Sequence, residues 1–287
     1  MKNSDPLGDR MKLYENAEAG RRLMPLLPAL IRLDGRAFHS FTADLPRPFE
    51  GRLSRLMIEA TRILVADTNA RIGYTHSDEI TLVLASERPD PSIWFDGRVH
   101  KMVSQSAATA TAAFKALLPE AIPEKAALAA DRRPTFDARV WNVPDRTEAV
   151  NALLWREADA ARNSLQMAAR ALYAHDQLHG RSAAELHDLL FARGVNWNDY
   201  PAFFKRGAYV RRTAVRTRFT AAEIDALPPL HDARRNPDLL VERAGIAAVE
   251  MPPLARVINR EAVVFDGADP VTDPAPLPPP APAGRAR

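Results

Sequence analysis

Cysteine is absent from this 287-residue chain. Disulfides, thiolate nucleophiles and cysteine-ligated zinc are therefore excluded. No uninterrupted apolar run is long enough to span a bilayer, and the N-terminal Met-Lys-Asn-Ser-Asp-Pro lacks the apolar core of a secretory signal. Hydrophobic residues make up 46% and charged residues 26%, as is usual in a globular protein. We therefore expect a cytoplasmic protein that does not enter a membrane.

Acidic residues are missing over one long stretch, between Tyr200 and Glu223. The net charge is only +3, but the sequence pI is about 9.3, and this stretch holds a block of cations. Those six residues are Lys205, Arg206, Arg211, Arg212, Arg216 and Arg218. A basic run without acidic residues is typical of a surface that binds a phosphate backbone, although a solvated strand face explains it equally well.

Two short acidic motifs carry the strongest chemical signal in the chain. Ile31-Arg32-Leu33-Asp34-Gly35-Arg36 and Thr75-His76-Ser77-Asp78-Glu79 each come where an apolar, strand-like run ends. Two carboxylates brought together in this way form a site for Mg²⁺, which prefers oxygen ligands and substrate phosphates. A paired-metal site of this kind supports displacement at phosphorus. The plain alternatives are an Asp-Gly turn and a polar hairpin tip.

The order of apolar patterns predicts an α+β fold in which helices pack on an antiparallel-rich sheet. A strand at 28–33 and a helix from Pro48 precede a hairpin whose strands are 70–74 and 80–84. We then expect a helix at 96–118, a strand at 136–143, helices at 147–174 and 183–193, a basic strand at 208–219 and β-like segments at 245–265. In such a β-α-β-β arrangement the first strand and the hairpin can lie side by side, which would place Asp34 beside Asp78.

The two motifs, taken in order with further segments, resemble the tRNA(His) guanylyltransferase family and its bacterial Thg1-like relatives. The resemblance covers roughly residues 12 to 215. Its other segments are Phe136-Asp137-Ala138-Arg139-Val140, Trp155-Arg156 with Asp159, and Asn196-Trp197-Asn198 with Lys205-Arg206-Gly207. Several motifs in one order are far more specific than either acidic motif alone.

The resemblance implies a palm-like antiparallel sheet and an enzyme that adds nucleotides to the 5′ end of tRNA, in the 3′–5′ direction. Members first activate a 5′-monophosphate with a nucleoside triphosphate. The 3′-hydroxyl of the incoming nucleotide then attacks and pyrophosphate leaves. GTP and ATP are the implied substrates, tRNA the implied partner, and a homotetramer the implied assembly.

The resemblance also implies a role for individual residues. Two Mg²⁺ ions would be held by Asp34, Asp78 and the backbone of Gly35, with Asp34, Asp78 and Glu79 as the catalytic carboxylates. The nucleotide pocket would consist of Asp34, Gly35, Arg36, Ala37, Phe38, His39, Arg47, Ser77 and Asp78, with Arg47 as the triphosphate contact. The predicted RNA-binding residues are Asn163, Lys205, Arg206, Arg211 and Arg212.

One position departs from the family pattern and affects which activity is expected. Eukaryotic members carry a His-Ile-Asn-type motif on a long helix, where this chain has Ala161, Arg162 and Asn163. Alanine at the histidine position favours templated 5′-end repair, the activity of the Thg1-like branch, over guanylylation of tRNA(His). The polar face of an amphipathic helix would also explain Arg162 and Asn163.

We divide the chain into a palm-like catalytic core at 1–145, a helical and basic β region at 146–265 that completes the catalytic and tRNA-binding unit, and a Pro-rich disordered tail at 266–287. Two other functions stay open from the sequence. One is a nucleotidyl cyclase-like enzyme acting on free nucleotides, which the basic block disfavours. The other is a non-catalytic tRNA-binding module, which the complete set of Asp34, Gly35 and Asp78 disfavours.

Overall fold

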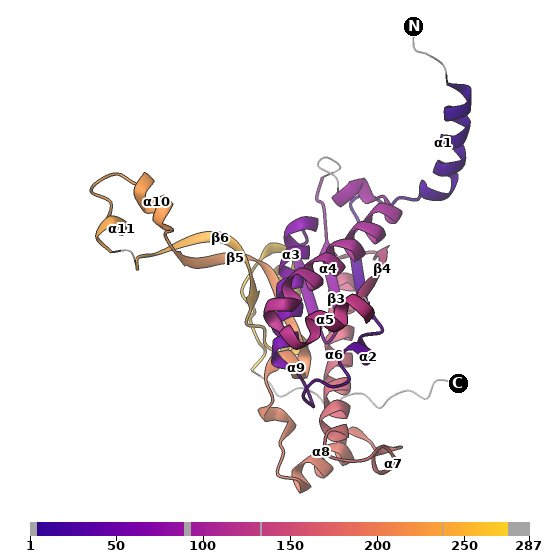
Figure 1. Ribbon diagram of the computed structural model, residues 1–287, viewed down its shortest axis with the longest axis vertical. Helices are drawn as coiled ribbons and strands as arrows, with labels where there is room; N and C mark the ends of the chain where they lie inside the picture. Colours follow the sequence, from indigo (N-terminus) through magenta and orange to yellow (C-terminus); the bar gives the residue numbers. More distant parts are fainter. Residues whose placement is uncertain (1–4, 89–92, 133, 237, 275–287) are drawn as a thin grey trace.

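One six-stranded sheet organises the molecule, with antiparallel pairing throughout and the strand order β4–β1–β3–β2–β5–β6 (Figure 1). Its strands are β1 (Ala29–Arg36), β2 (Ile72–His76), β3 (Glu79–Leu84), β4 (Thr135–Asn142), β5 (Ala208–Arg218) and β6 (Leu240–Val249). The computed structural model describes residues 5–88, 93–132, 134–236 and 238–274. The prediction of helices packed on an antiparallel sheet is confirmed.

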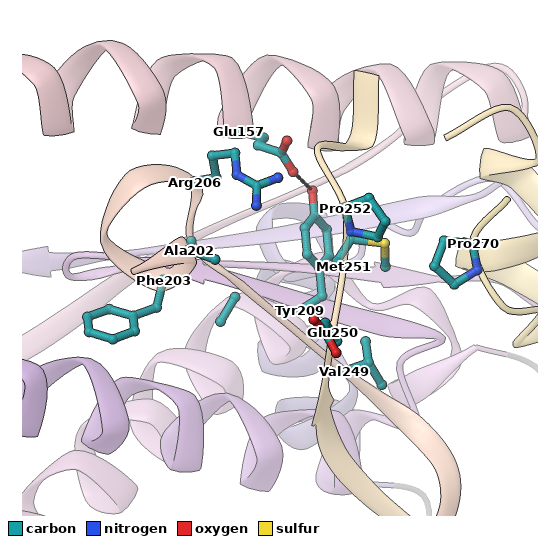
Figure 2. A pocket seen from close by; sticks show the side chains of 12 residues that line it. Glu157, Ala202, Phe203, Arg206, Tyr209, Val249, Glu250, Met251, Pro252 and Pro270 are labelled. Carbon is teal, nitrogen blue, oxygen red and sulfur yellow. Dashed lines mark hydrogen bonds between the residues drawn. The ribbon is translucent and has the colours of Figure 1, made fainter. Parts of the chain in front are cut away.

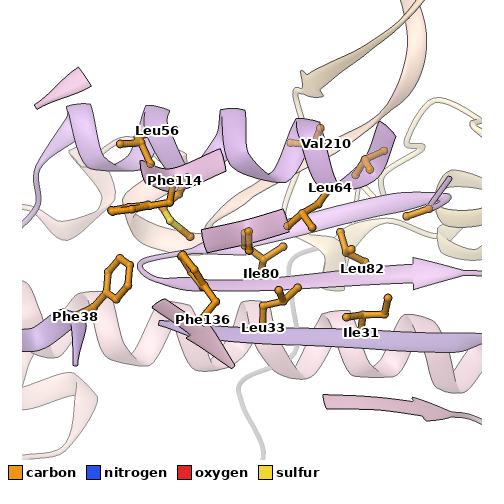
Figure 3. Close-up of a cluster of buried hydrophobic side chains, with 14 of the residues drawn as sticks. Ile31, Leu33, Phe38, Leu56, Leu64, Ile80, Leu82, Phe114, Phe136 and Val210 are labelled. Carbon is orange, nitrogen blue, oxygen red and sulfur yellow. The ribbon is translucent and has the colours of Figure 1, made fainter. Parts of the chain in front are cut away.

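The apolar residues of β1 are buried on both faces of the sheet. Ala29, Ile31 and Leu33 lie in a core that also contains residues of the helices α3 (Gly51–Thr68) and α4 (Val99–Ala121). Figure 3 shows part of this core, with apolar side chains of α3 above those of the strands. Glu50 caps the start of α3, since its side chain accepts a hydrogen bond from the Arg52 amide.

The opposite face of the sheet is covered by α6 (Arg146–Arg170) and by the C-terminal segment. Leu30 of β1 packs there in a second core, together with Leu153 of α6 and Val263. The Asp145 side chain accepts a hydrogen bond from the Glu148 amide at 2.8 Å and so caps the start of α6. A third core joins the far end of α6 to α8 (Ala183–Ala192) and α9 (Ala202–Arg206).

Two elements extend away from the body (Figure 1). The β5–β6 pair forms a long arm that carries α10 (Ala221–Ala226) and α11 (Asp232–Arg235) at its tip. At the other end of the molecule, α1 (Pro6–Ala19) has no buried residue. The remaining helices are α2 (Phe38–Phe41), α5 (Pro123–Arg132) and α7 (His175–Leu178). Among the described residues, no helix has both the length and the apolar character needed to cross a bilayer.

The C-terminal segments differ most from the sequence prediction. The β-like run expected at 245–265 contains the end of β6, a short 3₁₀-helix (Leu254–Arg256) and a π-helix (Ala262–Asp266). Val257, Val263 and Val264 of this run are buried in the core that also contains α6 residues, and this packing overrides their strand preference. The tail was predicted to be disordered from 266, but the Ile258 amide donates to the Val271 carbonyl at 2.8 Å and the Asp273 amide to the Arg256 carbonyl at 2.9 Å. The predicted start of the disordered tail at residue 266 was therefore wrong. The tail beyond residue 274 lies outside the described residues.

The division at residue 145 stays a prediction. Strands from both sides of it nevertheless share one sheet, since β5 pairs with β2 from Ile72↔Arg211 to Thr75↔Ala208. The helix predicted at 96–118 begins at Val99 and continues through Pro119 to Ala121. Proline lacks the amide hydrogen of the helical hydrogen bond and clashes with the preceding turn, and α4 ends two residues after it.

Candidate active site

The two acidic motifs meet at one end of the sheet. Asp34, near the end of β1, is directly opposite Glu79, the first residue of β3. The Gly35 amide donates a hydrogen bond to the Asp78 carbonyl at 3.1 Å. The prediction that the first strand and the hairpin lie side by side is confirmed, so the spatial condition for a shared cation site is met.

A two-residue turn, Ser77-Asp78, joins β2 to β3 and presents the Asp78 carboxylate. Ser77 has a left-handed backbone conformation with φ of 55°, and its hydroxyl donates to the Asp78 carboxylate at 3.1 Å. The Thr75 hydroxyl donates to the Glu79 carbonyl at 2.9 Å across the turn. These short-range bonds fix the carboxylate relative to the end of β1.

Both aspartates have a raised pKa. Burial raises the pKa of Asp78 to about 6, and the negative charge of Asp34 adds to the effect. Burial is also the main cause that raises the pKa of Asp34, followed by the Glu79 carboxylate, while Arg32 opposes the shift. The folded protein thus holds two carboxylates whose charged forms are costly until a cation compensates them.

This donor set fits Mg²⁺. The protein oxygens available at the meeting point are the carboxylates of Asp34 and Asp78 and the nearby carbonyl of Gly35. No group of three or more His, Cys, Asp or Glu side chains suited to a metal occurs in the described part of the chain. Mg²⁺ matches such a sparse site because one or two carboxylates usually hold it, with water and substrate phosphates completing the shell.

Glu79 has a different environment from its neighbour Asp78. Its carboxylate accepts hydrogen bonds from Arg32 of β1 at 2.6 Å and from Arg156 of α6. Arg156 also pairs with Asp159 at 3.1 Å, and its side chain is only 9% exposed. Glu79, which we predicted as catalytic, therefore ties α6 to the strand end through two arginines.

The Arg156 contacts lead to a stability prediction. Arg156→Met should lower the free energy of unfolding by about 2–3 kcal/mol, somewhat less than the usual cost of breaking a fully buried pair because Glu79 remains partly exposed. Denaturant unfolding followed by circular dichroism measures the change. Arg162→Met is the matched control, since the Arg162 side chain is 63% exposed and also pairs with Asp159. It should shift stability by less than about 0.5 kcal/mol, and equal losses for the two variants would contradict the assignment.

A cavity of about 410 Å³ opens beside the hairpin turn. It brings together five residues of the predicted nucleotide pocket: Phe38, His39, Arg47, Ser77 and Asp78. Phe38 is 2% exposed, and its ring packs 5.0 Å from Phe114 and 5.1 Å from Phe136, so it chiefly forms part of the core. Asp34, Gly35, Arg36 and Ala37 are not part of this lining, but Gly35 touches both Phe38 and the turn.

Several lining residues escaped the sequence prediction. Thr42 follows α2, and Leu53 belongs to α3. Met167 and Arg170 belong to the end of α6, and Ala171 follows it directly. A signal for the α6 residues was present in the sequence. Arg156, Asp159, Asn163, Met167 and Arg170 follow one another at intervals of three or four, as residues on one helix face do.

A larger cavity of about 570 Å³ contains neither acidic motif. Figure 2 shows Glu157, Arg206 and Tyr209 at this cavity. The Glu157 carboxylate accepts hydrogen bonds from the Tyr209 hydroxyl at 2.7 Å and from the Leu254 amide at 2.8 Å. Burial raises the pKa of Glu157, while those hydrogen bonds oppose the shift. Because this carboxylate already joins α6 to β5, we place the candidate active site at the smaller cavity.

The structure corrects the interpretation of the basic block. Arg211 is buried, and its guanidinium donates to the Val263 carbonyl at 3.0 Å and to the Ala268 carbonyl at 2.7 Å. Its assignment as an RNA-binding residue was therefore wrong. Arg216 pairs with Glu242 at 3.2 Å and Arg218 with Asp238 at 3.3 Å. The cations had no nearby acids in sequence, but β6 and the segment before it supply them in space.

The other predicted RNA-binding residues have varied environments. Arg212 is exposed on β5 and has no ion-pair partner within the described ranges. Lys205 donates to the Asn198 carbonyl and lies 5.5 Å from the Trp197 ring centre, while burial lowers its pKa. Arg206 lines the larger cavity, and Asn163 is exposed on α6 and donates to Asp159 at 3.3 Å.

Comparison with known proteins agrees with this geometry. A family model described as tRNAHis guanylyltransferase matches residues 8–144. The tRNA(His) guanylyltransferase of Schizosaccharomyces pombe is 28% identical over 212 residues, covering 69% of this chain and 77% of that protein. A solved bacterial tRNA(His) guanylyltransferase (Thg1)-like protein in complex with ATP is 33% identical with a TM-score of 0.65, covering 72% of this chain and 87% of that one. Another such structure, in complex with GTP, is 26% identical with a TM-score of 0.65, covering 91% and 98% of the two chains. The predicted palm-like fold class is confirmed by these similarities.

Proposed function

This chain belongs to the tRNAHis guanylyltransferase family and is a nucleotidyltransferase of that kind, and from this premise we propose that it adds nucleotides to the 5′ end of tRNA in a Mg²⁺-dependent, 3′–5′ reaction. ATP and GTP, which are bound in two similar structures, are the proposed substrates. Ala161 stands where eukaryotic members have histidine, and this favours templated 5′-end repair over guanylylation of tRNA(His). The homotetramer expected from the resemblance stays a prediction.

The observation that carries the proposal is the meeting of Asp34 and Asp78 beside a cavity that Arg47 also lines. The cavity is lined by one carboxylate, Asp78, and by the Arg47 guanidinium, and Asp34 lies at the adjoining strand end. This arrangement suits a substrate that brings its own negative charge and a divalent cation. Phosphoryl-type transfer requires little covalent chemistry from the protein, because its loose transition state depends on positioning and charge neutralisation. The site contains groups for both positioning the substrate and neutralising its charge.

Each residue then has a distinct part in the reaction. Asp34, Asp78 and the Gly35 carbonyl would hold Mg²⁺, which when bound supplies charge neutralisation at the phosphates under attack. The Arg47 guanidinium binds the triphosphate, and the Ser77 hydroxyl lies within reach of the same phosphates. Glu79 does not bind the cation in this scheme. It keeps the start of β3 and α6 in place through Arg32 and Arg156.

The direct test uses a 5′-truncated tRNA bearing a 5′-monophosphate, with Mg²⁺ and the four nucleoside triphosphates. We expect a product lengthened at its 5′ end, and the added nucleotide should change when the opposing base of the 3′ strand is changed. Addition of guanosine alone, whatever the opposing base, would favour tRNA(His) guanylylation. A cyclic nucleotide formed without RNA would indicate a cyclase-like enzyme, and binding of tRNA without any product would indicate a non-catalytic module.

RNA binding should depend on salt through the cations that remain free. Arg212→Ala should weaken tRNA binding and reduce the slope of log Kd against log salt by about 1, because one phosphate contact is lost. Filter binding at several salt concentrations measures this slope. Arg216→Ala is the control, since Arg216 is already paired with Glu242 on the neighbouring strand. Equal slopes for wild type and the Arg212 variant would show that Arg212 does not contact the RNA.

A further inference from the structure

Arg170 is a cation at the candidate active site that has no partner among the residues that the structure describes. It is the last residue of α6, its side chain is exposed, and it lines the 410 Å³ cavity with Ser77 and Asp78. Its guanidinium forms no hydrogen bond or ion pair with another residue in the described part of the chain. Other arginines on the same helix differ, since Arg156 pairs with Glu79 and Asp159, and Arg162 with Asp159.

A second guanidinium reaches the same cavity from a distant part of the sequence. Arg47 lies in the loop before α3, and its one hydrogen bond to the described residues goes to the Ala43 carbonyl at 3.3 Å. Two guanidinium groups lining one cavity repel each other, and the lining contains a single carboxylate, Asp78, which the cation site would engage. An anion bound between them would remove this repulsion.

The loop that carries Arg47 is anchored by Lys125 of α5. Lys125 of α5 is 1% exposed, and its ammonium donates to the Phe41 carbonyl at 2.7 Å and to the Asp44 carboxylate. The Lys125 nitrogen also lies 5.4 Å from the Phe41 ring centre. On the other side of the cavity Arg170 extends from a helix of 25 residues. Both cations are therefore presented by anchored elements, which lowers the ordering cost of binding.

We propose that Arg170 binds a phosphate group in this cavity, together with Arg47, and so forms the second side of a phosphate clamp. The inference rests on the proposed function and adds a residue from α6 to the nucleotide site. Two phosphate sources fit this chemistry: the triphosphate of the nucleotide and the 5′-phosphate of the RNA. Guanidinium groups suit either one because their fork of donors matches the oxygens of a phosphate.

The test compares wild type with Arg170→Met, which keeps the length and apolar part of the side chain. Kd values for ATP, ADP, AMP and adenosine are measured by calorimetry in the presence of Mg²⁺. We expect a rise in Kd of about 10-fold or more for ATP, a smaller rise for AMP and none for adenosine, since one charge-assisted hydrogen bond is lost. Arg170→Lys should recover part of the affinity. Arg162→Met, on the same helix but paired with Asp159, should leave all four Kd values unchanged.

A second arm separates the two phosphate sources. Binding of a 5′-phosphorylated tRNA is compared with that of the same tRNA carrying a 5′-hydroxyl. Loss of ATP affinity in Arg170→Met assigns the triphosphate, and loss confined to the phosphorylated tRNA assigns the RNA 5′-phosphate. Either result supports the clamp.

The simplest competing role for Arg170 is a favourable interaction with the C-terminal end of α6. That role predicts a lower melting temperature in Arg170→Met, with phosphate affinities equal to those of wild type. This result would overturn the inference while the proposed function stands. If wild-type protein bound neither ATP nor phosphorylated tRNA and gave no extended product, the proposed function and the inference would fail together.

Discussion

Asp34→Asn and Asp78→Asn each lower the rate of 5′-nucleotide addition by on the order of 10²-fold or more, with little change in the affinity for tRNA. The expected loss is large because each substitution removes one of the two proposed charged oxygen ligands, while the neighbouring Glu79 carboxylate is already engaged by Arg32 and Arg156. Asparagine keeps the shape of the side chain, so the geometry of the strand end and the turn is retained. The loss therefore reports on charge alone.

The two asparagine variants should lose activity without losing stability. Both aspartates have a folded pKa raised above the ordinary value of 3.8 by burial. A raised carboxyl pKa means that the folded state binds the proton more tightly, so wild-type stability falls as the pH rises through this range. At pH 7.5 the asparagine variants should be as stable as wild type or more stable, and the difference should vanish below about pH 4.

Single-turnover extension of a 5′-phosphorylated tRNA measures the rates, and urea unfolding at two pH values measures the stabilities. Asp188→Asn is the control, since Asp188 is an exposed residue of α8 outside the candidate site. Full activity in either Asp34→Asn or Asp78→Asn would show that the contact between the two motifs has only a structural role. A rate loss accompanied by equal loss of stability would also count against a role in catalysis.

The side-by-side placement of the two acidic motifs was the part of the structure that the sequence predicted best. A strand that carries Asp34 near its end and a hairpin whose two-residue turn holds Asp78 are local features, and local patterns determine them. Placing the two motifs together needed only the expectation that a hairpin pairs with a preceding strand. The cores of β1 and α3 followed in the same way from alternation and helical spacing.

The errors arose where distant segments decide the outcome. Arg216 and Arg218 acquired partners from β6 and the segment before it, namely Glu242 and Asp238, which lie well over a dozen residues further along the chain. Arg211 was buried by a C-terminal segment whose apolar residues had been expected to form strands. A basic run in a sequence shows charge density but not the acids that a neighbouring strand brings to it.

Gly35→Ala is expected to disable the enzyme without removing any functional group. A Cβ at residue 35 would lie 2.5 Å from Cδ2 of Phe38 and 2.8 Å from Cβ of Asp78. Neither atom is the free end of a flexible side chain. The Phe38 ring is packed against Phe114 and Phe136, and the Asp78 Cβ is attached directly to the backbone of the turn. Relief of the clash must therefore displace the core or move the hairpin turn away from β1.

Displacement of the turn would break the Gly35–Asp78 backbone hydrogen bond of 3.1 Å and separate the two carboxylates. A shift of about 1 Å in a reacting group can cost on the order of 10²-fold in rate, and overpacking of a filled core costs about 1–3 kcal/mol. We expect both losses in Gly35→Ala, measured by extension assays and by urea unfolding. Mg²⁺ titrations of activity should also require higher metal concentrations, because the two ligands no longer converge.

Loss of stability alone must be separated from loss of site geometry. Gly194→Ala provides the comparison, since Gly194 has φ of +72° and a Cβ there would meet no atom within 4 Å. The left-handed conformation makes alanine unfavourable at that position by about 1–2 kcal/mol. Gly194→Ala should therefore be destabilised to a similar extent and keep its rate of nucleotide addition at temperatures where it is folded. If Gly35→Ala also kept its rate, the close approach of β1 to the Ser77-Asp78 turn would serve stability only, and Asp34 and Asp78 would not need to act as a pair.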